Sequence, residues 1–260
     1  MHRTTYTYVS QKKDDEHIRK RLRELAQKKR KYGSPMLHIL LRREGLVINH
    51  KRTERIYKEE GLSLRKKRRR KKTASESRVE MYRASKPNEK WAMDFVADSL
   101  YNGRRLRMLT VIDEYTRECP VIEVDTSLTG HRVTQVLDRV ALNRGLPESI
   151  VVDNGPEFIS KALDAWAYKR GIKLHFIRPG KPSDNCFIES FNGTFREECL
   201  NENWFLNIKD ARNIVENWRV EYNRERPHTS IGKIPPEEFA LQVAAPMGIP
   251  ISSNKEQLML

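Results

Sequence analysis

Apolar side chains recur every three or four residues in the N-terminal third of the chain, and this spacing predicts three short helices. The first covers residues 14–31, which begin with acids and end with bases, as the helix dipole favours. A second is predicted from Ser34 to a stop near Gly45, and a third follows the N-cap residue Asn49 and closes at Gly61. Two short helices joined by a tight turn, the second of them basic, are typical of a helix-turn-helix.

From Trp91 onward the chain alternates between apolar and polar positions, which indicates β-strands. The segments WAMDFVAD, RLRMLTVIDEYT and CPVIEVD predict an antiparallel meander of three strands. The elements expected after it are a helix at 130–143, a strand at ESIVVDNG, a helix at 160–169, a strand at KLHFIRP, a helix beginning at Ser183 or Asp184, and a helix at 209–223. This order predicts an α/β fold with a mixed sheet, preceded by a small all-α helix-turn-helix domain.

The helix after the fifth strand is predicted to be amphipathic. Its apolar stripe is formed by Ile188, Phe191, Phe195 and Cys199. The neighbouring polar stripe is formed by Asn185, Glu189, Asn192 and Arg196. Glu189 therefore lies at the seam between the two stripes. A single acid on a solvated helix face is ordinary, so only partners elsewhere in the chain can give Glu189 a function.

Positive charge is concentrated in the first third of the chain. Residues 1–85 hold 27 of the 50 Lys and Arg and 10 of the 35 Asp and Glu, whereas the remainder has a net charge of −2. Nucleic acid is the expected partner of so basic a segment, because each neutralised phosphate releases counterions; a solvated basic tail is the alternative. The candidate DNA-binding residues here are Lys51, Arg52 and Arg55 on the third helix and Arg68 and Arg69 in the run RKKRRRKK.

The rest of the composition excludes several classes of protein. No run of about 18 apolar residues is present to cross a membrane, and the N-terminus lacks the apolar core of a signal peptide. Cys119, Cys186 and Cys199 form no CxxC pair, which argues against a disulfide framework and against a cysteine-based zinc site. We expect all three to be small buried residues in a protein of the reducing cytoplasm, associated with the bacterial nucleoid and not with a membrane.

Three acids stand in contexts that suggest a shared role. Asp94 lies within an apolar strand, where a carboxylate is costly unless something compensates it; Asp153 ends the fourth strand, before a glycine turn; Glu189 is on the amphipathic helix. If the first and fourth strands are neighbours, the three acids meet at one edge of the sheet. The rival acids are Asp98, Asp113 and Asp125, of which Asp113 is the most serious substitute for Asp94.

Three such carboxylates imply a metal site. At about 4 Å apart they would repel one another by roughly 4 kcal/mol per pair at an effective dielectric of about 20, and a divalent cation removes that repulsion. Carboxylate oxygens with no His or Cys nearby select Mg²⁺ or Mn²⁺. We therefore expect two such ions and in-line displacement at phosphorus, in which one ion activates the nucleophile and the other stabilises the leaving oxygen.

The motifs around these acids resemble those of a known family. VVDNGPEF, GKPSDNCFIESFNG and YNRERPHTSIG, with 35 residues between Asp153 and Glu189, resemble the integrase-core motifs of DDE transposases from bacterial insertion sequences, specifically the OrfB type encoded by the second of two reading frames. The resemblance implies an RNase H-like core, as in retroviral integrases, with Asp94, Asp153 and Glu189 as catalytic metal ligands. It also implies magnesium-dependent nicking at the element's ends and attack of the freed 3′-OH on another phosphodiester.

The same resemblance suggests how the chain is divided and what it contacts. We expect a helix-turn-helix DNA-binding domain at 1–62, a basic linker at 63–86, the catalytic core with its C-terminal helix at 87–240 and a tail at 241–260. The implied partners are double-stranded DNA of the element ends and the target, further copies of the chain assembled on that DNA, and the first-frame product that such elements usually supply. Cys186 departs from the family, which usually has a small residue such as alanine there.

Three further residues near the acids are candidates for DNA contact. Arg196, seven residues after Glu189 on the same helical face, matches a basic position that contacts terminal DNA in such enzymes; the alternative is an ion pair with Glu189 or Glu197. Asn154 and Lys181 lie on loops expected at the same edge of the sheet.

Other polar and aromatic residues have simpler interpretations. His175 reads as a structural histidine in a strand, whereas the sequence assigns no role to His228. Trp166, Trp204 and Trp218 are expected in the core, although an exposed tryptophan could stack on a base. Two other functions remain open from the sequence: a non-catalytic repressor that binds the element ends, and a plain RNase H-like nuclease that degrades DNA without joining it.

Overall fold

A computed structural model describes residues 15–64, 83–178 and 185–247. The chain forms two compact units, residues 1–72 and 73–260, and each is described here by itself. The expected positions of Arg68, Arg69 and Lys181, the helix start at Ser183 or Asp184, and the end of the tail lie outside the described residues.

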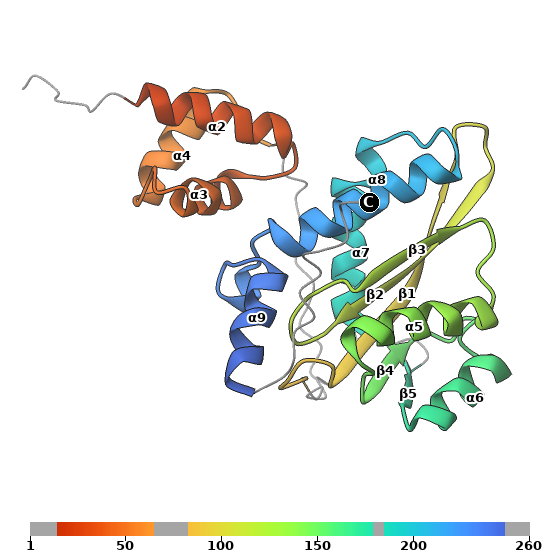
Figure 1. Cartoon of the computed structure of the whole chain (residues 1–260). Coiled ribbons are helices and arrows are strands. Elements are labelled where there is room, and N and C mark those ends of the chain that lie inside the picture. The colour runs from red at the N-terminus through yellow and green to blue at the C-terminus, as the bar shows by residue number, and fades with distance from the viewer. Residues whose placement is uncertain (1–14, 65–82, 179–184, 248–260) are drawn as a thin grey trace, which may run out of the picture. The chain divides into compact units, whose positions relative to one another are not determined.

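The described residues of the first unit form a bundle of three helices, as predicted. They are α2 (Glu16–Lys28), α3 (Ser34–Arg43) and α4 (His50–Glu59), coloured red to orange in Figure 1. Their apolar faces meet in one core formed by Ile18, Leu22, Leu25, Tyr32, Leu37, Leu41, Val47, Ile56 and Tyr57. Asn49 caps α4, since its side-chain oxygen accepts a hydrogen bond of 3.0 Å from the Lys51 N–H.

The second unit is built on a five-stranded mixed sheet. Its strands are β1 (Lys90–Ser99), β2 (Arg105–Asp113), β3 (Val121–Asp125), β4 (Ser149–Val152) and β5 (Lys173–Phe176). Their order is β3-β2-β1-β4-β5. The first three strands form the predicted antiparallel meander, and β4 pairs parallel with both β1 and β5. The condition for a shared carboxylate site, that the first and fourth strands are neighbours, is therefore met.

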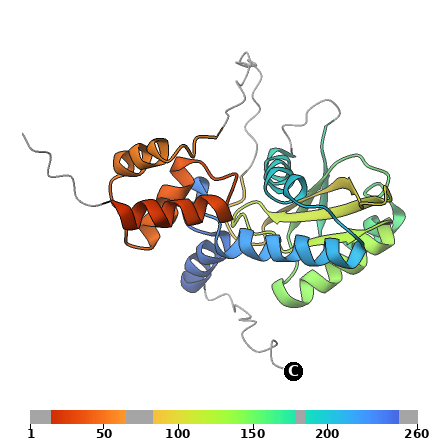
Figure 2. The ribbon, with the colours of Figure 1, turned by 90° about the horizontal axis from the view of Figure 1, so that it is seen from above.

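Helices cover both faces of this sheet. One core layer packs α5 (Gly130–Arg144) and α6 (Lys161–Arg170) against the strands. The other packs α7 (Cys186–Glu198) and α8 (Ile208–Arg224) against the opposite face. In Figure 2 the teal α7 and the green α5 lie on opposite sides of the yellow strands. Within the described ranges, no helix has the length and apolar character needed to cross a membrane.

The C-terminal elements were only partly predicted. After α8 the chain forms a 3₁₀ turn (Thr229–Ile231) and a further helix, α9 (Pro236–Met247). No helix was expected at α9, although a proline at its first position followed by two acids is an ordinary helix start, and residues 241–247, expected in the tail, belong to this helix. The α9 helix packs against α8.

Several expectations about burial are wrong. Trp166 and Trp218 are buried as expected, but Trp204 is 78% exposed because it lies in a turn after α7 and not on a helix. Cys186 is exposed because it begins α7 at the surface, whereas Cys119 and Cys199 are buried. His175 is exposed because β5 is the edge strand and its residues pack little.

Candidate active site

Two of the three predicted acids come together through the pairing of β1 with β4. This parallel ladder aligns Ala92 with Val151, so that two residues further along each chain Asp94 is level with Asp153. Ala92, Val96 and Val151 pack in the core layer that contains α7 and α8. Because side chains alternate along a strand, both carboxylates face the α7 side of the sheet.

The α7 helix delivers the third acid to the same side. Ile188, Phe191 and Phe195 are buried against the sheet, which leaves Glu189 exposed at the edge of that contact. Asn192, one turn after Glu189, donates a hydrogen bond of 2.7 Å from Nδ2 to Asp94 Oδ2. The contact that positions α7 over β1 is therefore a direct bond to one of the candidate acids.

Thr110 completes this connection from β2. Its hydroxyl lies 2.9 Å from Asn192 Oδ1 and 3.1 Å from the Asp94 carbonyl oxygen, so its single proton is shared between these two acceptors. Thr110 is fully buried in a strand that is otherwise apolar at this point. A buried hydroxyl needs a partner, and here it fixes which way the Asn192 amide points.

The electrostatics of Asp94 show that the three acids are neighbours. Burial raises the pKa of Asp94, and the charges of Asp153 and Glu189 raise it further. Hydrogen bonds from the Phe95 N–H and from Asn192 act in the opposite direction, but the net pKa stays above the ordinary value. A negative charge at Asp94 is therefore held at a cost that a cation would remove.

The loop after β4 holds Asp153 in place. Its Oδ1 accepts a hydrogen bond of 2.9 Å from the Gly155 N–H. A Cβ at position 155 would stand 2.9 Å from the same oxygen, so a larger residue there would displace the Asp153 carboxylate from its present position. Asn154 donates 2.9 Å from Nδ2 to the Ile177 carbonyl, which ties the loop to the end of β5. Asn154, predicted to contact DNA, thus uses its amide to support the loop.

The donor chemistry of the three acids fits a hard divalent cation, because all three supply carboxylate oxygens. In the part of the chain that the structure describes, however, no three His, Cys, Asp or Glu side chains lie close enough together to hold a metal ion. The structure thus brings Asp94 and Asp153 side by side, with Glu189 within electrostatic reach, but does not draw them into a closed set of ligands.

The rival acids have other partners. Asp113 is fully buried and accepts hydrogen bonds from the Asn88, Tyr115 and Thr116 N–H groups and from Arg144, so it stabilises the turn after β2. Asp125 pairs with Arg212 at 3.0 Å. Asp98 lies on β1, four residues beyond Asp94.

The side chain of Arg196 is exposed on α7. Its Nη2 donates a hydrogen bond of 3.1 Å to the Ala97 carbonyl of β1. The alternative predicted for Arg196, an ion pair with Glu189 or Glu197, does not occur among the described residues.

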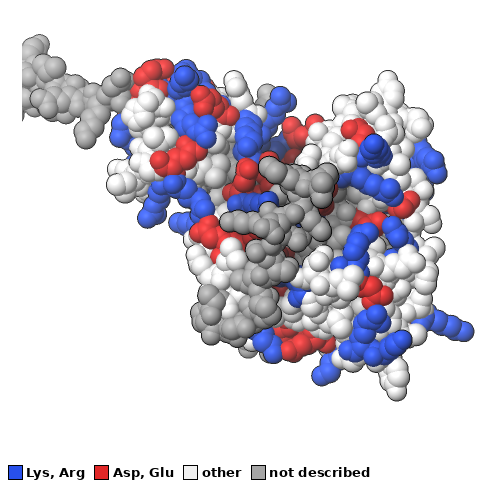
Figure 3. Space-filling view, viewed as in Figure 1, with Lys and Arg blue, Asp and Glu red and all other residues white. Residues whose placement is uncertain are grey.

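The predicted DNA-binding residues of the first unit are engaged within the fold. Arg52 and Arg55 both pair with Asp15, which lies just before α2. Burial alone would raise the pKa of Asp15, but the bonds from these two arginines lower it. Lys51 is exposed on the same helix. Figure 3 shows basic side chains interspersed with acidic ones, so this surface is less uniformly positive than the sequence suggested.

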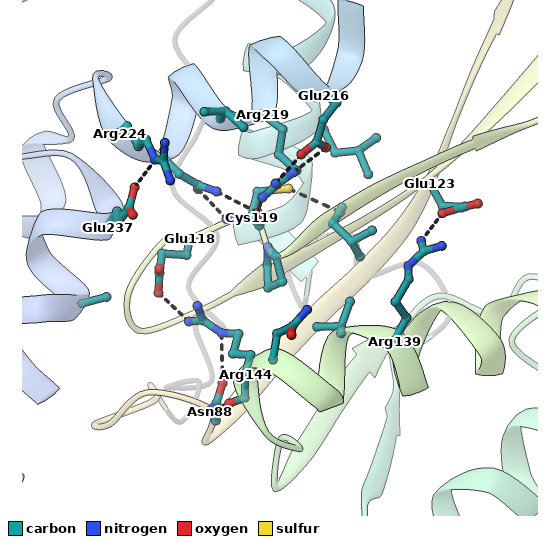
Figure 4. A pocket seen from close by; sticks show the side chains of 18 of the residues that line it. Asn88, Glu118, Cys119, Glu123, Arg139, Arg144, Glu216, Arg219, Arg224 and Glu237 are labelled. Carbon is teal, nitrogen blue, oxygen red and sulfur yellow. Dashed lines mark hydrogen bonds and ion pairs between the residues drawn. The ribbon is translucent and has the colours of Figure 1, made fainter. Parts of the chain in front are cut away.

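A pocket of about 1130 Å³ lies away from the three acids, between β3, α5, α8 and α9 (Figure 4). Its charged side chains pair with one another. These pairs are Arg144–Glu118, Arg139–Glu123, Arg219–Glu216 and Arg224–Glu237. The pocket therefore has the character of a stabilised junction between elements, and it contains none of the candidate active-site acids.

Sequence reasoning did not assign a role to two residues of the site. Asn192 was placed on the polar stripe of α7 without a partner, and Thr110 was not noticed. A threonine between apolar strand residues was the available signal. The bond between Asn192 and Asp94 joins residues 98 positions apart, and no local pattern predicts such a pair.

Comparison with known proteins agrees with this arrangement. Two models described as integrase core domain match residues 84–182 and 170–236, and an HTH-like domain matches residues 13–72. The insertion element IS407 31.7 kDa protein of Burkholderia multivorans is 46% identical over 91% of this chain and 85% of its own length. The insertion element IS476 39.2 kDa protein of Xanthomonas euvesicatoria is 48% identical over 85% of this chain, which spans 63% of that protein.

More distant relatives carry a functional name and the same fold. Transposase InsF for insertion sequence IS3A of Escherichia coli is 27% identical over 81% of this chain and 77% of its own length. The intasome of simian T-cell lymphotropic virus, solved in complex with the PP2A regulatory subunit B56 gamma, contains a chain that aligns with a TM-score of 0.58. That match has 17% identity and covers 92% of this chain and 80% of the viral one, and it shows a shared fold. The chain belongs to the OrfB-type transposases of bacterial insertion sequences, with an integrase core of the RNase H-like fold.

Proposed function

We propose that the chain catalyses metal-dependent nicking at the ends of its insertion sequence and transfer of the freed 3′-OH to another phosphodiester. What supports the proposal is that Asp94, Asp153 and Glu189 belong to the same side of the sheet, where burial raises the pKa of Asp94 and the charges of the two other acids add to that rise. A site that accumulates negative charge in this way suits Mg²⁺ or Mn²⁺, and two ions are proposed.

Each residue of the site has a proposed task. Asp94, Asp153 and Glu189 would hold the ions, which when bound supply activation of the attacking oxygen and neutralisation of the leaving oxygen. Asn192 orients the Asp94 carboxylate through its 2.7 Å bond to Oδ2, while Oδ1 accepts the Phe95 N–H, and each oxygen keeps a further lone pair for an ion. Gly155 allows the Asp153 loop its close turn.

DNA binding is proposed for both units. We propose that Lys51, Arg52 and Arg55 of α4, together with Arg68 and Arg69 of the basic run, contact the element ends, with 1–62 as the binding domain and 63–86 as its linker. To bind DNA, Arg52 and Arg55 would give up their ion pairs with Asp15 and pair with phosphate oxygens in its place. Phosphate accepts charge-assisted hydrogen bonds from arginine as a carboxylate does.

Contacts near the core and the assembly complete the proposal. Arg196, Lys181 and Asn154 would contact the DNA beside the acids. Several copies would act together on the DNA, because each reaction joins two DNA ends to a target. A first-frame product would be a further partner.

Strand transfer with labelled DNA that carries the element's own ends tests this function. The wild-type chain should give nicked and joined products with Mg²⁺, whereas Asp153→Asn and Glu189→Gln should give neither. Asp98→Asn is the matched control, since it removes an acid from β1 only four residues from Asp94 and should leave the reaction intact.

Other results would select the alternatives. Binding of the ends without any nicking by the wild-type chain would indicate a repressor, and degradation without joining would indicate a nuclease. Equal joining by the wild-type chain and the two substituted chains would refute the assignment of these acids.

A further inference from the structure

Three large apolar side chains are exposed where the turn between β1 and β2 meets the segment between α7 and α8. Tyr101 is 74% exposed, Trp204 is 78% exposed and Leu206 is 67% exposed. The rings of Tyr101 and Trp204 meet edge to face with their centroids 6.3 Å apart. Tyr101 lies in the turn between β1 and β2, the yellow hairpin of Figure 1, and Trp204 lies in the segment between α7 and α8. We call Tyr101, Trp204 and Leu206 the aromatic patch.

The backbone around the aromatic patch is fixed, so the exposure does not come from a loose loop. Phe205, between Trp204 and Leu206, is buried in the core. The Tyr101 N–H donates 2.8 Å to the Phe205 carbonyl, which joins the two segments. The Leu206 N–H donates 3.0 Å to Asp210 Oδ2 at the start of α8. Phe205 anchors the segment, and its two neighbours are presented to solvent.

Basic side chains accompany the aromatic patch. Arg104 ends the turn that contains Tyr101 and Arg105 begins β2; both are exposed, and neither forms an ion pair within the described ranges. The acids close to the aromatic patch along the chain are Asp98, Glu202 and Asp210, and the carboxylates of Asp98 and Asp210 accept bonds from the backbone N–H groups of Ser99 and Leu206. Among the described residues, the two exposed arginines thus have no ion-pair partner that an anionic ligand would have to displace.

The aromatic patch is also connected to the candidate active site. Tyr101 comes seven positions after Asp94, which is about 23 Å of extended chain. Arg196, exposed on α7, is bonded to the Ala97 carbonyl between these two points. Arg196 therefore lies between the acids and the aromatic patch along β1.

We propose that the aromatic patch binds an unpaired nucleotide of a DNA strand that leaves the active site, with Trp204 stacking on the base and Arg104 and Arg105 contacting the phosphates. Aromatic rings beside free cations are the means by which proteins hold single strands, because every base offers a face for stacking and every phosphate a charge. The proposal takes DNA as the substrate, in line with the proposed function.

Trp204 is a natural probe for this proposal. Of the four tryptophans, Trp91, Trp166 and Trp218 are buried at 0%, 6% and 9% exposure, so Trp204 is the one that a soluble quencher reaches. We would measure acrylamide quenching and binding affinity of the full chain with a blunt duplex and with the same duplex carrying a short oligothymidine tail. The tailed duplex should shield Trp204, whereas the blunt duplex should not.

Three substitutions separate stacking from general apolar contact. Trp204→Leu keeps apolar surface but removes the aromatic face, and should weaken binding of the tailed duplex by roughly tenfold. Trp204→Phe keeps a face and should bind nearly as the wild-type chain does. Tyr168→Leu is the matched control, because Tyr168 is 91% exposed on α6, and it should have no effect.

The results that would overturn the proposal are distinct from failure of the catalytic assignment. Unchanged affinity in Trp204→Leu would overturn it, as would equal losses in the Leu and Phe variants. Shielding of Trp204 that depends on protein concentration without DNA would also overturn it and would identify a surface for another copy of the chain. The inactive Asp153→Asn chain should still show tail-dependent shielding, so loss of nicking and loss of stacking are separable.

Discussion

Replacing Asp153 by asparagine should stabilise the metal-free protein, although it removes a residue proposed to be essential. The charge of Asp153 raises the pKa of Asp94, which means that the two carboxylates repel each other in the folded state. Asparagine keeps an oxygen that can accept the Gly155 N–H, so the loop after β4 is retained. The substitution therefore removes repulsion while preserving the local structure.

The size of the effect follows from the spacing of the strands. Neighbouring strands lie about 4.8 Å apart, which places carboxylates on adjacent strands about 5–6 Å apart. At that separation two charges repel by roughly 3 kcal/mol at an effective dielectric of about 20 and by roughly 0.8 kcal/mol in bulk water. Both groups are partly exposed, so we expect a gain of about 1 kcal/mol, which corresponds to roughly 2–4 °C in Tm for a unit of this size.

The sign of the pH dependence provides a second readout. Because the folded-state pKa of Asp94 is raised, its protonated form favours folding, and this stability is lost as pH rises from the unfolded pKa through the folded one. Asp153→Asn should weaken this loss. Thermal unfolding with EDTA and with Mg²⁺, across a range of pH, measures both effects.

Wild-type protein should gain stability from Mg²⁺, and Asp153→Asn should gain little. A substituted protein that is less stable in EDTA, or that keeps the full gain from Mg²⁺, would refute the reasoning.

Three further predictions concern other parts of the chain. Arg226→Ala should cost about 3 kcal/mol in urea unfolding, because it leaves Glu198 half-buried without the three hydrogen bonds that Arg226 donates to it, and an unchanged midpoint would contradict this. The pKa of His228 is lowered to about 3 by burial, so stability should fall as pH drops from about 6.5 toward 3, and His228→Phe should abolish that part of the acid transition in a pH titration of Tm. Asp15→Asn should release Arg52 and Arg55 and so tighten binding to a random duplex at low salt, measured by fluorescence anisotropy. Weaker binding would contradict this and would mean that Asp15 positions the two arginines for DNA.

The sequence predicted the elements of the fold because the deciding signals were local. Alternation from Trp91 and the three-and-four spacing around Phe191 are properties of short segments, and the structure has a strand and a helix there. Exposure was less predictable, because it depends on what packs from elsewhere. Trp204 looked like a core residue, yet Phe205 takes the buried position and turns Trp204 outward.

The acids of the candidate site could be predicted from the sequence, but the residues that hydrogen-bond to them could not. The strand context of Asp94 and the glycine turn after Asp153 pointed to the two residues that the pairing of β1 with β4 brings side by side. The bond from Asn192 to Asp94 and the burial of Thr110 arise only when α7 packs on the sheet. The separation of Glu189 from the other two acids likewise depends on tertiary packing, and the spacing of 35 residues along the chain does not determine it.

Anomalous diffraction from crystals grown with Mn²⁺ tests the central claim most directly. The account predicts manganese peaks bound by carboxylate oxygens of Asp94, Asp153 and Glu189, with α7 brought closer to the strand ends than in the metal-free chain. Peaks at other residues, or none at these three while the crystals contain saturating manganese, would contradict the claim that these acids form one metal site.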